Sequence, residues 1–415
     1  MPPALTAFVS DERVRVGAAA LFAIYAAYIF ILAGAQDLTF LIVFCALLAF
    51  PFKPEPRFWR FKRPPWTAIL AVAFLFWAVI SAAWSPVEDK MQSLRLALGA
   101  PLYALFAFRI GALADPWKGR VEAGLVFLVF ALGFFFFAES LTGGALTTSF
   151  KTAVEGYEPG VEHTITKVNQ LLGHGVFPFI MLIGPAAAIT WREGGPAIGA
   201  MLVALGLFSA FSFDLAANSV GMTLAMIAAF IAWRRPRLAV SLAFGLTAGA
   251  MLVLPLLLPT LAGVLPEDVR AAMPHSWEWR LEIWARAGEF MRESLWFGHG
   301  LDAARPLHAE GVLRGELTDF MPIHPHSAPI QIWLETGLMG VMLAAGALTL
   351  MGGRIAGAPR LSQPQAAAVV WVLTIYVVQT YLSYGAWQEW HQSALALAVA
   401  MCFFLGAEKP EEGRR

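Results

Sequence analysis

The sequence predicts an all-α integral membrane protein of about twelve transmembrane helices. Of its 415 residues, 58% are hydrophobic and only 14% are charged, whereas a soluble domain is nearer half apolar and a quarter charged. The apolar residues gather in runs close to the ~20 residues with which a helix crosses a bilayer. We expect these helices to form one membrane domain over residues 1–415. The runs centre on residues 17–35, 37–52, 66–84, 94–113, 121–138, 170–191, 196–213, 215–233, 238–262, 328–351, 366–385 and 390–406.

Charge and cysteine usage exclude several other classes of protein. Lys plus Arg equals Asp plus Glu at 29 each, so the chain lacks the excess of basic residues expected of a nucleic-acid-binding protein. Cys45 and Cys402 lie inside apolar runs near opposite ends of the chain, which argues against a disulfide framework or a zinc site. No cleavable signal peptide is predicted, because many further spans follow the first apolar run.

The cationic connections between the spans predict the orientation of the protein in its membrane. Four short connections, each with two or more Lys or Arg, join an even-numbered span to the next odd-numbered one, so they share a side, and the alternate connections at 36–37 and 383–390 contain no Lys or Arg. Cytoplasmic loops carry an excess of these residues. Both termini are therefore predicted to be cytoplasmic. The cations are Lys53, Arg57, Arg60, Lys62, Arg63, Arg109, Lys118, Arg120, Arg234, Arg235, Arg237, Arg354 and Arg360.

Two longer loops, at about 139–169 and 263–327, then fall on the non-cytoplasmic side. The second lies between spans nine and ten, and loops of this size usually carry function. Within it, Ser276 is a plausible N-cap for an amphipathic helix. We expect this helix to lie in the membrane interface with its tryptophans at headgroup level. Its polar face would hold Glu278, Glu282, Arg286, Glu289 and Glu293, and its apolar face Trp277, Leu281, Trp284, Gly288, Met291, Ile283 and Phe290.

Two arginines of this helix are predicted to differ in function. Arg286 lies on the polar face, four residues after Glu282, where an ordinary ion pair accounts for it. Arg280 falls within the apolar arc between Trp277 and Trp284, so its charge must reach water, find a partner or bind an anion. The anion could be a lipid phosphate or a phosphate of a ligand, which suits the guanidinium group. We favour Arg280 as the phosphate-binding residue.

His324 and His326 flank Pro325 just before the tenth span. Ser327 is a good N-cap and Pro329 is tolerated in a first helical turn, so His326 is expected at a helix N-terminus. This position attracts anions and disfavours imidazolium, which leaves a neutral histidine able to accept a proton. A capping histidine or an adventitious metal ligand is the alternative. No third metal ligand lies at a telling spacing, so no metal site is predicted.

Three segments resemble the O-antigen ligase and polymerase superfamily. Residues 279–300, WRLEIWARAGEFMRESLWFGHG, are similar to the Arg-x-x-x-Trp stretch of the family, which ends in a Gly-x-Gly turn. Residues 324–340, HPHSAPIQIWLETGLMG, resemble its His-Asn-x-x-Leu-Gln...Glu-Leu-Gly-x-x-Gly signature, and Glu335 and Gly337 match it there. We expect both of these residues to pack within span ten. Residues 168–185, VNQLLGHGVFPFIMLIGP, look like the sixth-span pattern.

The resemblance implies an enzyme of the bacterial inner membrane with its active site in the periplasm. Such enzymes take a glycan linked through diphosphate to undecaprenol and transfer it to a sugar hydroxyl. They are thought to invert the anomeric centre without a metal or another cofactor. If the roles known in the family are carried over to this sequence, His326 would be the general base and Arg280 would hold the diphosphate. Further substrate-binding residues would be Arg286, Lys167 and His324. A base and cations at the leaving group are what this chemistry needs.

The chain also departs from the family pattern. Ser327 stands where the family often has Asn. The family often has an arginine near Ser in the eighth span or following the Asn of the sixth, where this chain has Asn218-Ser219 and Asn169-Gln170. The diphosphate site is therefore expected to use Lys167 or another loop cation instead.

Three functions stay open at this point. The first is a ligase with lipid A-core as the acceptor, and the second is an O-antigen or exopolysaccharide polymerase with another lipid-linked glycan as the acceptor. The third is a twelve-helix transporter or flippase. Transporters place polar groups near the bilayer midplane in two related halves, and only Asp214 and Asn218 favour that function here. Membrane lipids are expected partners in every case.

Overall fold

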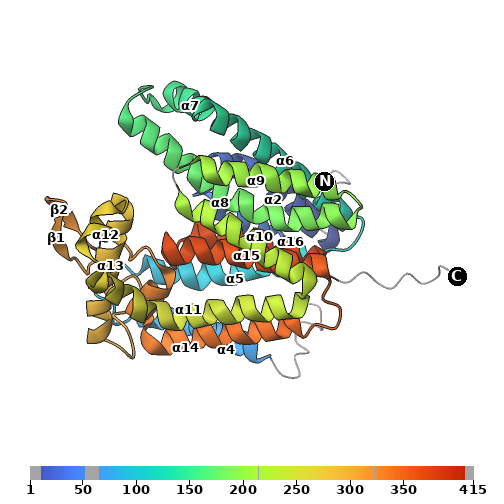
Figure 1. The fold of residues 1–415 in the computed structure, drawn as a ribbon. Coiled ribbons are helices and arrows are strands. Elements are labelled where there is room, and N and C mark those ends of the chain that lie inside the picture. Colours follow the sequence, from blue (N-terminus) through green and yellow to red (C-terminus); the bar gives the residue numbers. More distant parts are fainter. Residues whose placement is uncertain (1–10, 52–64, 214, 322, 407–415) are drawn as a thin grey trace.

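The computed structural model describes residues 11–51, 65–213, 215–321 and 323–406 (Figure 1). Within these ranges the chain is helical except for one short hairpin. The helices and strands are α2 (Glu12–Leu32), α3 (Leu38–Leu48), α4 (Trp66–Ser81), α5 (Met91–Gly111), α6 (Trp117–Thr142), α7 (Ala145–Glu155), α8 (Glu162–Arg192), α9 (Pro196–Ser212), α10 (Ala216–Arg234), α11 (Pro236–Val264), α12 (Glu267–Ala272), α13 (His275–Glu293), β1 (Glu310–Leu313), β2 (Glu316–Asp319), α14 (Ala328–Ala356), α15 (Gln363–Leu382) and α16 (Glu389–Phe404).

Each of the twelve apolar runs coincides with a helix, which supports a multi-pass, all-helical membrane protein. Among the described residues, eight of these helices are long and apolar enough to cross a membrane: α2, α5, α6, α8, α10, α11, α14 and α15. The other four, α3, α4, α9 and α16, have 11, 16, 17 and 16 residues. The count of twelve spans therefore stays a prediction.

The helices pack around two main hydrophobic cores. The larger core joins α2, α3, α6, α8 and α16 through side chains such as Phe136 and Phe177. The second joins α4, α11 and α14 to the loop helix α13, and it includes Trp284 and Trp333. Figure 1 shows α4, α11 and α14 side by side along one edge of the molecule. The large loop is thus built onto the second group of helices.

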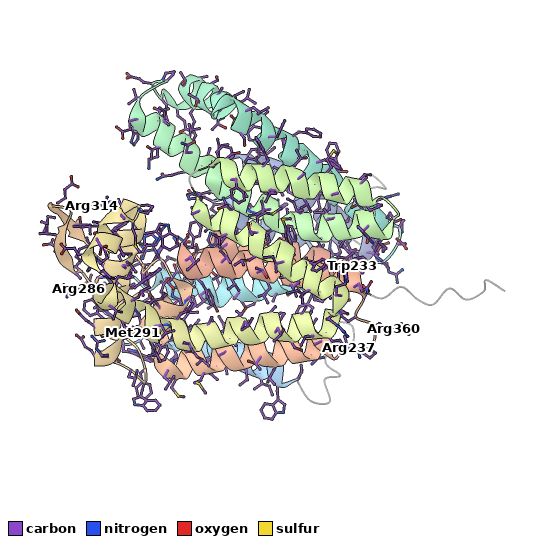
Figure 2. All side chains as sticks on the ribbon, viewed as in Figure 1. Trp233, Arg237, Arg286, Met291, Arg314 and Arg360 are labelled. Carbon is purple, nitrogen blue, oxygen red and sulfur yellow. The ribbon has the colours of Figure 1, made fainter. Side chains whose placement is uncertain are left out.

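The two ends of the helix bundle differ in composition. Arg237 and Arg360, from two connections predicted to be cytoplasmic, lie at one end, whereas Arg286 and Arg314 of the large loop lie at the other (Figure 2). This arrangement agrees with the predicted grouping of the connections. Five further cations of that grouping lie outside the described residues: Lys53, Arg57, Arg60, Lys62 and Arg63.

The large loop contains more structure than the sequence predicted. Its main helix, α13, begins at His275 after Pro274, so Ser276 lies inside the helix and is not the N-cap. The antiparallel strands β1 and β2 were not expected, because each has only four residues. Arg314 and Gly315 connect them with φ of 51° and 86°, which is typical of the two-residue turns that join twisted strands.

The apolar face of α13 packs against protein. Leu281, Trp284 and Met291 are buried as predicted, but their neighbours are helices α11 and α14. Trp284 is only 2% exposed. A Cβ added to Gly288 would lie 2.4 Å from Cβ of Pro259 on α11, which shows how closely the two helices approach. Trp284 therefore contacts protein, and the position of α13 at headgroup level stays a prediction.

Helix α14 is broken at Gly337, whose φ of 62° and ψ of −170° are not helical. The turn that follows α13 inserts at this break. The amide of Gly300 donates to the carbonyl of Glu335 at 2.8 Å, and the amide of Leu338 donates to the carbonyl of Leu295 at 2.9 Å. Gly337 thus has a conformational function besides packing, since glycine alone adopts this backbone geometry without strain.

Candidate active site

His326 lies one residue before Ser327, the N-cap residue of α14, and has a φ of +50°. Its Nδ1 is 2.9 Å from the backbone carbonyl oxygen of Ser383. A carbonyl only accepts hydrogen bonds, so Nδ1 must carry the proton and Nε2 must hold the free lone pair. The fold therefore fixes the tautomer in which His326 can accept a proton at Nε2.

The expected cap of α14 is only partly correct. Ser327 occupies the N-cap position and its carbonyl accepts from the amide of Gln331 at 2.9 Å. Its side chain makes no capping hydrogen bond, and Ser327 Oγ is buried without a partner among the described residues. Pro329 lies in the first turn, as predicted.

His324 supports the backbone at His326. Its Nδ1 accepts from the amide of His326 at 3.1 Å, so its proton lies on Nε2. That nitrogen is 3.3 Å from the side-chain amide of Gln388, whose Oε1 has no other partner among the described residues. Turning the amide by 180° places Oε1 opposite the Nε2–H of His324, which satisfies both groups.

Burial lowers the pKa of both histidines. For His326, burial is the main cause and the nearby charge of Arg280 acts in the same direction, while the bond to Ser383 opposes them. Burial, with smaller contributions from His326 and Arg305, lowers the pKa of His324 to about 3. Both rings are thus neutral near pH 7, the state in which a histidine can act as a base.

Arg280 lies on α13, close enough to His326 for its charge to lower the pKa of that ring. Its Nη1 donates to the carbonyl of Ser276 at 3.0 Å, and its guanidinium lies 5.4 Å from the ring centroid of Trp277. Its Nε is buried without a partner in the described part of the chain. Burial lowers the pKa of this arginine, yet arginine stays charged in proteins. A half-buried cation whose Nε donor is unused is well suited to bind an anion.

Arg286 has a different environment. It is half-buried and donates to Glu289 Oε2 at 2.9 Å. The predicted pairing with Glu282 is wrong, because α12 brings Arg270 against α13 and Arg270 pairs with Glu282 instead. Figure 2 shows Arg286 toward the outer edge of the loop. Arg286 is thus neutralised by a residue of its own helix. This agrees with the prediction from its place on the polar face that an ordinary ion pair accounts for it.

Lys167 lies near the start of α8 and is exposed. Figure 1 shows α7 and the start of α8 at the same end of the molecule as α12 and α13. In the part of the chain that the structure describes, no hydrogen bond or ion pair of Lys167 links it to Arg280 or His326. Its assignment to substrate binding stays a prediction.

The short connection between α15 and α16, residues 383–388, contributes site residues that the sequence did not reveal. Ser383 fixes His326, and Gln388 contacts His324. The hydroxyl of Tyr384 is buried and has no hydrogen-bond partner among the described residues. Burial raises the pKa of this hydroxyl, and the charge of Arg280 acts in the opposite direction. In the sequence, the only sign that this segment contributes to the site is its unusual density of polar and aromatic residues for a short connection.

A cavity lies elsewhere in the loop. It has a volume of about 650 Å³ and is lined by residues of α12, α13 and the β1–β2 turn. None of the residues around His326 lines it. Arg314 pairs there with Glu278 at 2.6 Å, so its charge is already used. Among the described residues, no three His, Cys, Asp or Glu side chains are grouped to hold a metal ion.

Comparison with known proteins matches the segment of the chain that holds Arg280 and His326. Residues 198–345 match the family model described as O-antigen ligase, a range that includes α13, both histidines and the start of α14. A protein of Rickettsia conorii named "putative polysaccharide ligase" is 26% identical over 286 residues, which is 66% of this chain and 65% of the relative. The chain thus spans about 65% of the length of that relative. Residues 198–345 of this multi-pass membrane protein therefore match the O-antigen ligase family model, in agreement with the superfamily that its sequence resembles.

Proposed function

We propose that the protein is an O-antigen ligase-type glycosyltransferase. It moves a glycan from an undecaprenyl-diphosphate donor to a sugar hydroxyl of lipid A-core. One observation carries the proposal: the Ser383 carbonyl leaves a free lone pair on Nε2 of His326, and Arg280, whose Nε has no partner among the described residues, is close enough for its charge to affect that ring. A base and a cation are the two groups that glycosyl transfer from a diphosphate requires.

The reaction is a direct displacement. Nε2 of His326 accepts the proton of the acceptor hydroxyl while the hydroxyl oxygen forms a bond to the anomeric carbon. The bond between that carbon and the diphosphate oxygen breaks, and the electron pair leaves with the diphosphate. Arg280 neutralises the negative charge that develops there. Attack on the face opposite the leaving group inverts the anomeric centre.

We place the site on the periplasmic face of a bacterial inner membrane, with both termini cytoplasmic. The argument is the position of two short, arginine-containing connections. Arg237 and Arg360 lie at the end of the bundle away from the large loop (Figure 2), and positive connections favour the cytoplasm. A reporter fused at Gly311 in the loop tests this orientation, because a cytoplasmic signal would contradict it.

The structure gives the transport alternative little support. Asn218 donates to the carbonyl of Gly173 at 2.9 Å and accepts from Gln379, so it ties three helices together. Asp214 lies outside the described residues. Polymerisation needs the same base and cation, with a lipid-linked glycan as the acceptor. The lipopolysaccharide of a deletion strain separates the two: capped core without polymer indicates a ligase, and single repeat units on core indicate a polymerase.

Replacement of the base tests the function most directly. In vesicles supplied with lipid-diphosphate glycan and lipid A-core, we expect His326→Ala to lower transfer on the order of 10²- to 10⁴-fold, the usual contribution of a general base. His308→Ala is the matched control, because His308 is an exposed loop histidine whose partner is Asp319. Full activity in His326→Ala would rule out the base.

The pH dependence of transfer gives a second test. Because the pKa of His326 is lowered from 6.5 by burial and by Arg280, Nε2 stays unprotonated at and below that pH. We expect the turnover number to stay constant from neutral pH to below 6.5 and to fall only as the pH drops through the lowered pKa. A turnover number that already falls above pH 6.5 would contradict a lowered pKa for His326.

The two arginines should respond differently to substitution. We expect Arg280→Ala to lose transfer by roughly 10²-fold or more, because it removes the cation at the leaving group. Arg280→Lys should rescue it only in part, since lysine lacks the planar fork. Arg286→Ala should stay near wild type. Equal damage in Arg280→Ala and Arg286→Ala would disprove the assignment.

A further inference from the structure

We propose that Glu335 is a positioning residue for the catalytic base, which it holds in place through the connection at residues 383–388. The sequence suggested only packing within span ten for this side chain. The inference rests on the proposed function of His326. It adds a second part of the active site, outside the segment that matches the family model, and names the residue that holds this part against α14.

Glu335 is the centre of a buried hydrogen-bond network. It lies in the first half of α14 and is 0% exposed. Its Oε1 accepts from Gln331 Nε2 at 2.9 Å, and its Oε2 accepts from the amide of Asp302 at 2.7 Å and from Trp387 Nε1 at 2.5 Å. These donors come from three different parts of the chain. One carboxylate thus joins α14, the loop after α13 and the α15–α16 connection.

Gln331 extends the network to the next residue of the connection. Its Nε2 is used on Glu335, and its Oε1 accepts from the amide of Ala386 at 2.8 Å. Ala386 and Trp387 are therefore both fixed to α14. Three residues before Ala386, the carbonyl of Ser383 holds Nδ1 of His326 at 2.9 Å. The carbonyl that selects the tautomer of the base belongs to a short segment that Glu335 and Gln331 hold.

The connection lies against α14 with no spare room. A Cβ added to Gly385 would lie 2.7 Å from Gln331 Oε1 and 3.1 Å from Cγ of His324. Gln388, at the end of the segment, contacts His324. The segment is thus held at both of its ends and in its middle, so its backbone cannot shift without moving the carbonyl at His326.

The directions of these hydrogen bonds explain why a carboxylate is needed. All three partners of Glu335 are donors, and an ionised carboxylate only accepts. In Glu335→Gln, one end of the new side chain is an NH₂ group that faces a donor. Reversing Gln331 to receive it would cost the bond from Ala386. Each arrangement therefore loses at least one bond, and buried groups left without partners are costly.

Loss of the network should affect the base in a specific way. If the Ser383 carbonyl moves, the ring of His326 is free to turn or to carry its proton on Nε2, and then it no longer accepts a proton from the substrate. The carbonyl also raises the pKa of His326, against burial and the charge of Arg280. His324 and Tyr384 are the other titratable groups of this environment. Weakening the carbonyl bond should therefore lower the pKa of the ring.

Two tryptophans of the same core give a matched experiment. Trp387→Phe removes an indole N–H that donates to Glu335, whereas Trp333→Phe removes a buried indole N–H of α14 that has no partner among the described residues. Full-length variants are compared in vesicles with lipid-diphosphate glycan and lipid A-core. The measurements are the turnover number, the pH profile of the turnover number, KM and the melting temperature. Glu335→Gln and His326→Ala are measured in the same way.

We expect Trp387→Phe to lower the turnover number on the order of 10-fold at nearly constant KM, because small misplacements of a catalytic group cost up to about 10²-fold. Its acid limb should move to lower pH. Trp333→Phe should keep the wild-type pH profile. Glu335→Gln should lower the turnover number more than Trp387→Phe does.

Two results would overturn the inference. One is a Trp387→Phe enzyme that matches Trp333→Phe in turnover and in pH profile. The other is a lowered turnover with an unshifted acid limb, which would indicate a merely structural contact. Full activity in His326→Ala would instead disprove the proposed function on which the inference rests, so the two failures are distinguishable.

Discussion

The two halves of α14 lie in different surroundings, and the contrast explains where the site is. Every residue from Ala328 to Gly337 is buried. Beyond Gly337 the buried residues form a stripe of mostly small side chains: Gly340, Val341, Ala344, Ala345, Ala347, Gly352 and Ala356. The other face of this second half carries large apolar groups such as Met339 and Met342, which are 44% and 57% exposed.

The contrast shows what each half can hold. The first half is enclosed by α4, α13, the loop turn at Gly298 and the 383–388 connection, so Gln331 and Glu335 find partners on several sides. The second half packs on α4 and α11, and its exposed face is apolar, as expected of a surface in contact with lipid. A polar group is tolerated within a membrane protein where protein partners surround it.

The largest effect is expected from filling the break between the halves. A Cβ on Gly337 would lie 2.4 Å from the backbone of Trp296, and its φ is 62°. We expect Gly337→Ala to lose at least about 3 kcal/mol of stability, from strain and from overlap with backbone that cannot move aside. Gly353→Ala is the control, because a Cβ there meets nothing within 4 Å.

The control should be neutral, or more stable by up to about 1 kcal/mol, as for alanine in an exposed helix. Melting temperatures in detergent measure both variants. Similar melting temperatures for Gly337→Ala and Gly353→Ala would mean that the break is not required.

A second comparison tests how much each half contributes to stability. Ile330 is 0% exposed in the first half, and Met342 is 57% exposed in the second. We expect Ile330→Ala to cost about 2–5 kcal/mol because it leaves a cavity. Met342→Ala should change stability by no more than about 0.5 kcal/mol. Unfolding in mixed micelles measures the difference, and equal costs would disprove the contrast between the halves.

The smallest effect concerns a carbonyl at the break in α14, which accepts a hydrogen bond from a side chain of another helix. Trp77 Nε1 donates at 2.8 Å to the carbonyl of Thr336, next to Gly337. We expect Trp77→Phe to cost about 1 kcal/mol, the usual contribution of one hydrogen bond. Trp66→Phe is the control on the same helix, since Trp66 is 71% exposed. No difference between the two in thermal unfolding would show that solvent or lipid replaces this donor.

Local patterns were sufficient for several features of this protein. The twelve helical runs follow from apolar stretches, and the burial of Leu281, Trp284 and Met291 follows from their spacing along α13. The difference between Arg280 and Arg286 has the same origin, although the partner of Arg286 was predicted incorrectly. That partner depends on α12, which places Arg270 on the carboxylate expected for Arg286, and spacing along one helix cannot show this.

By itself, the sequence determined the membrane-protein class, the large loop and the choice of His326 and Arg280 as site residues, because hydropathy, helical period and short motifs are properties of neighbouring residues. Only the tertiary structure decided which nitrogen of His326 keeps a free lone pair and what holds the ring. Ser383 is 57 residues from His326 along the chain, and Trp387 is 52 from Glu335. Such contacts form only when α14, α15 and α16 pack together, so no local pattern encodes them.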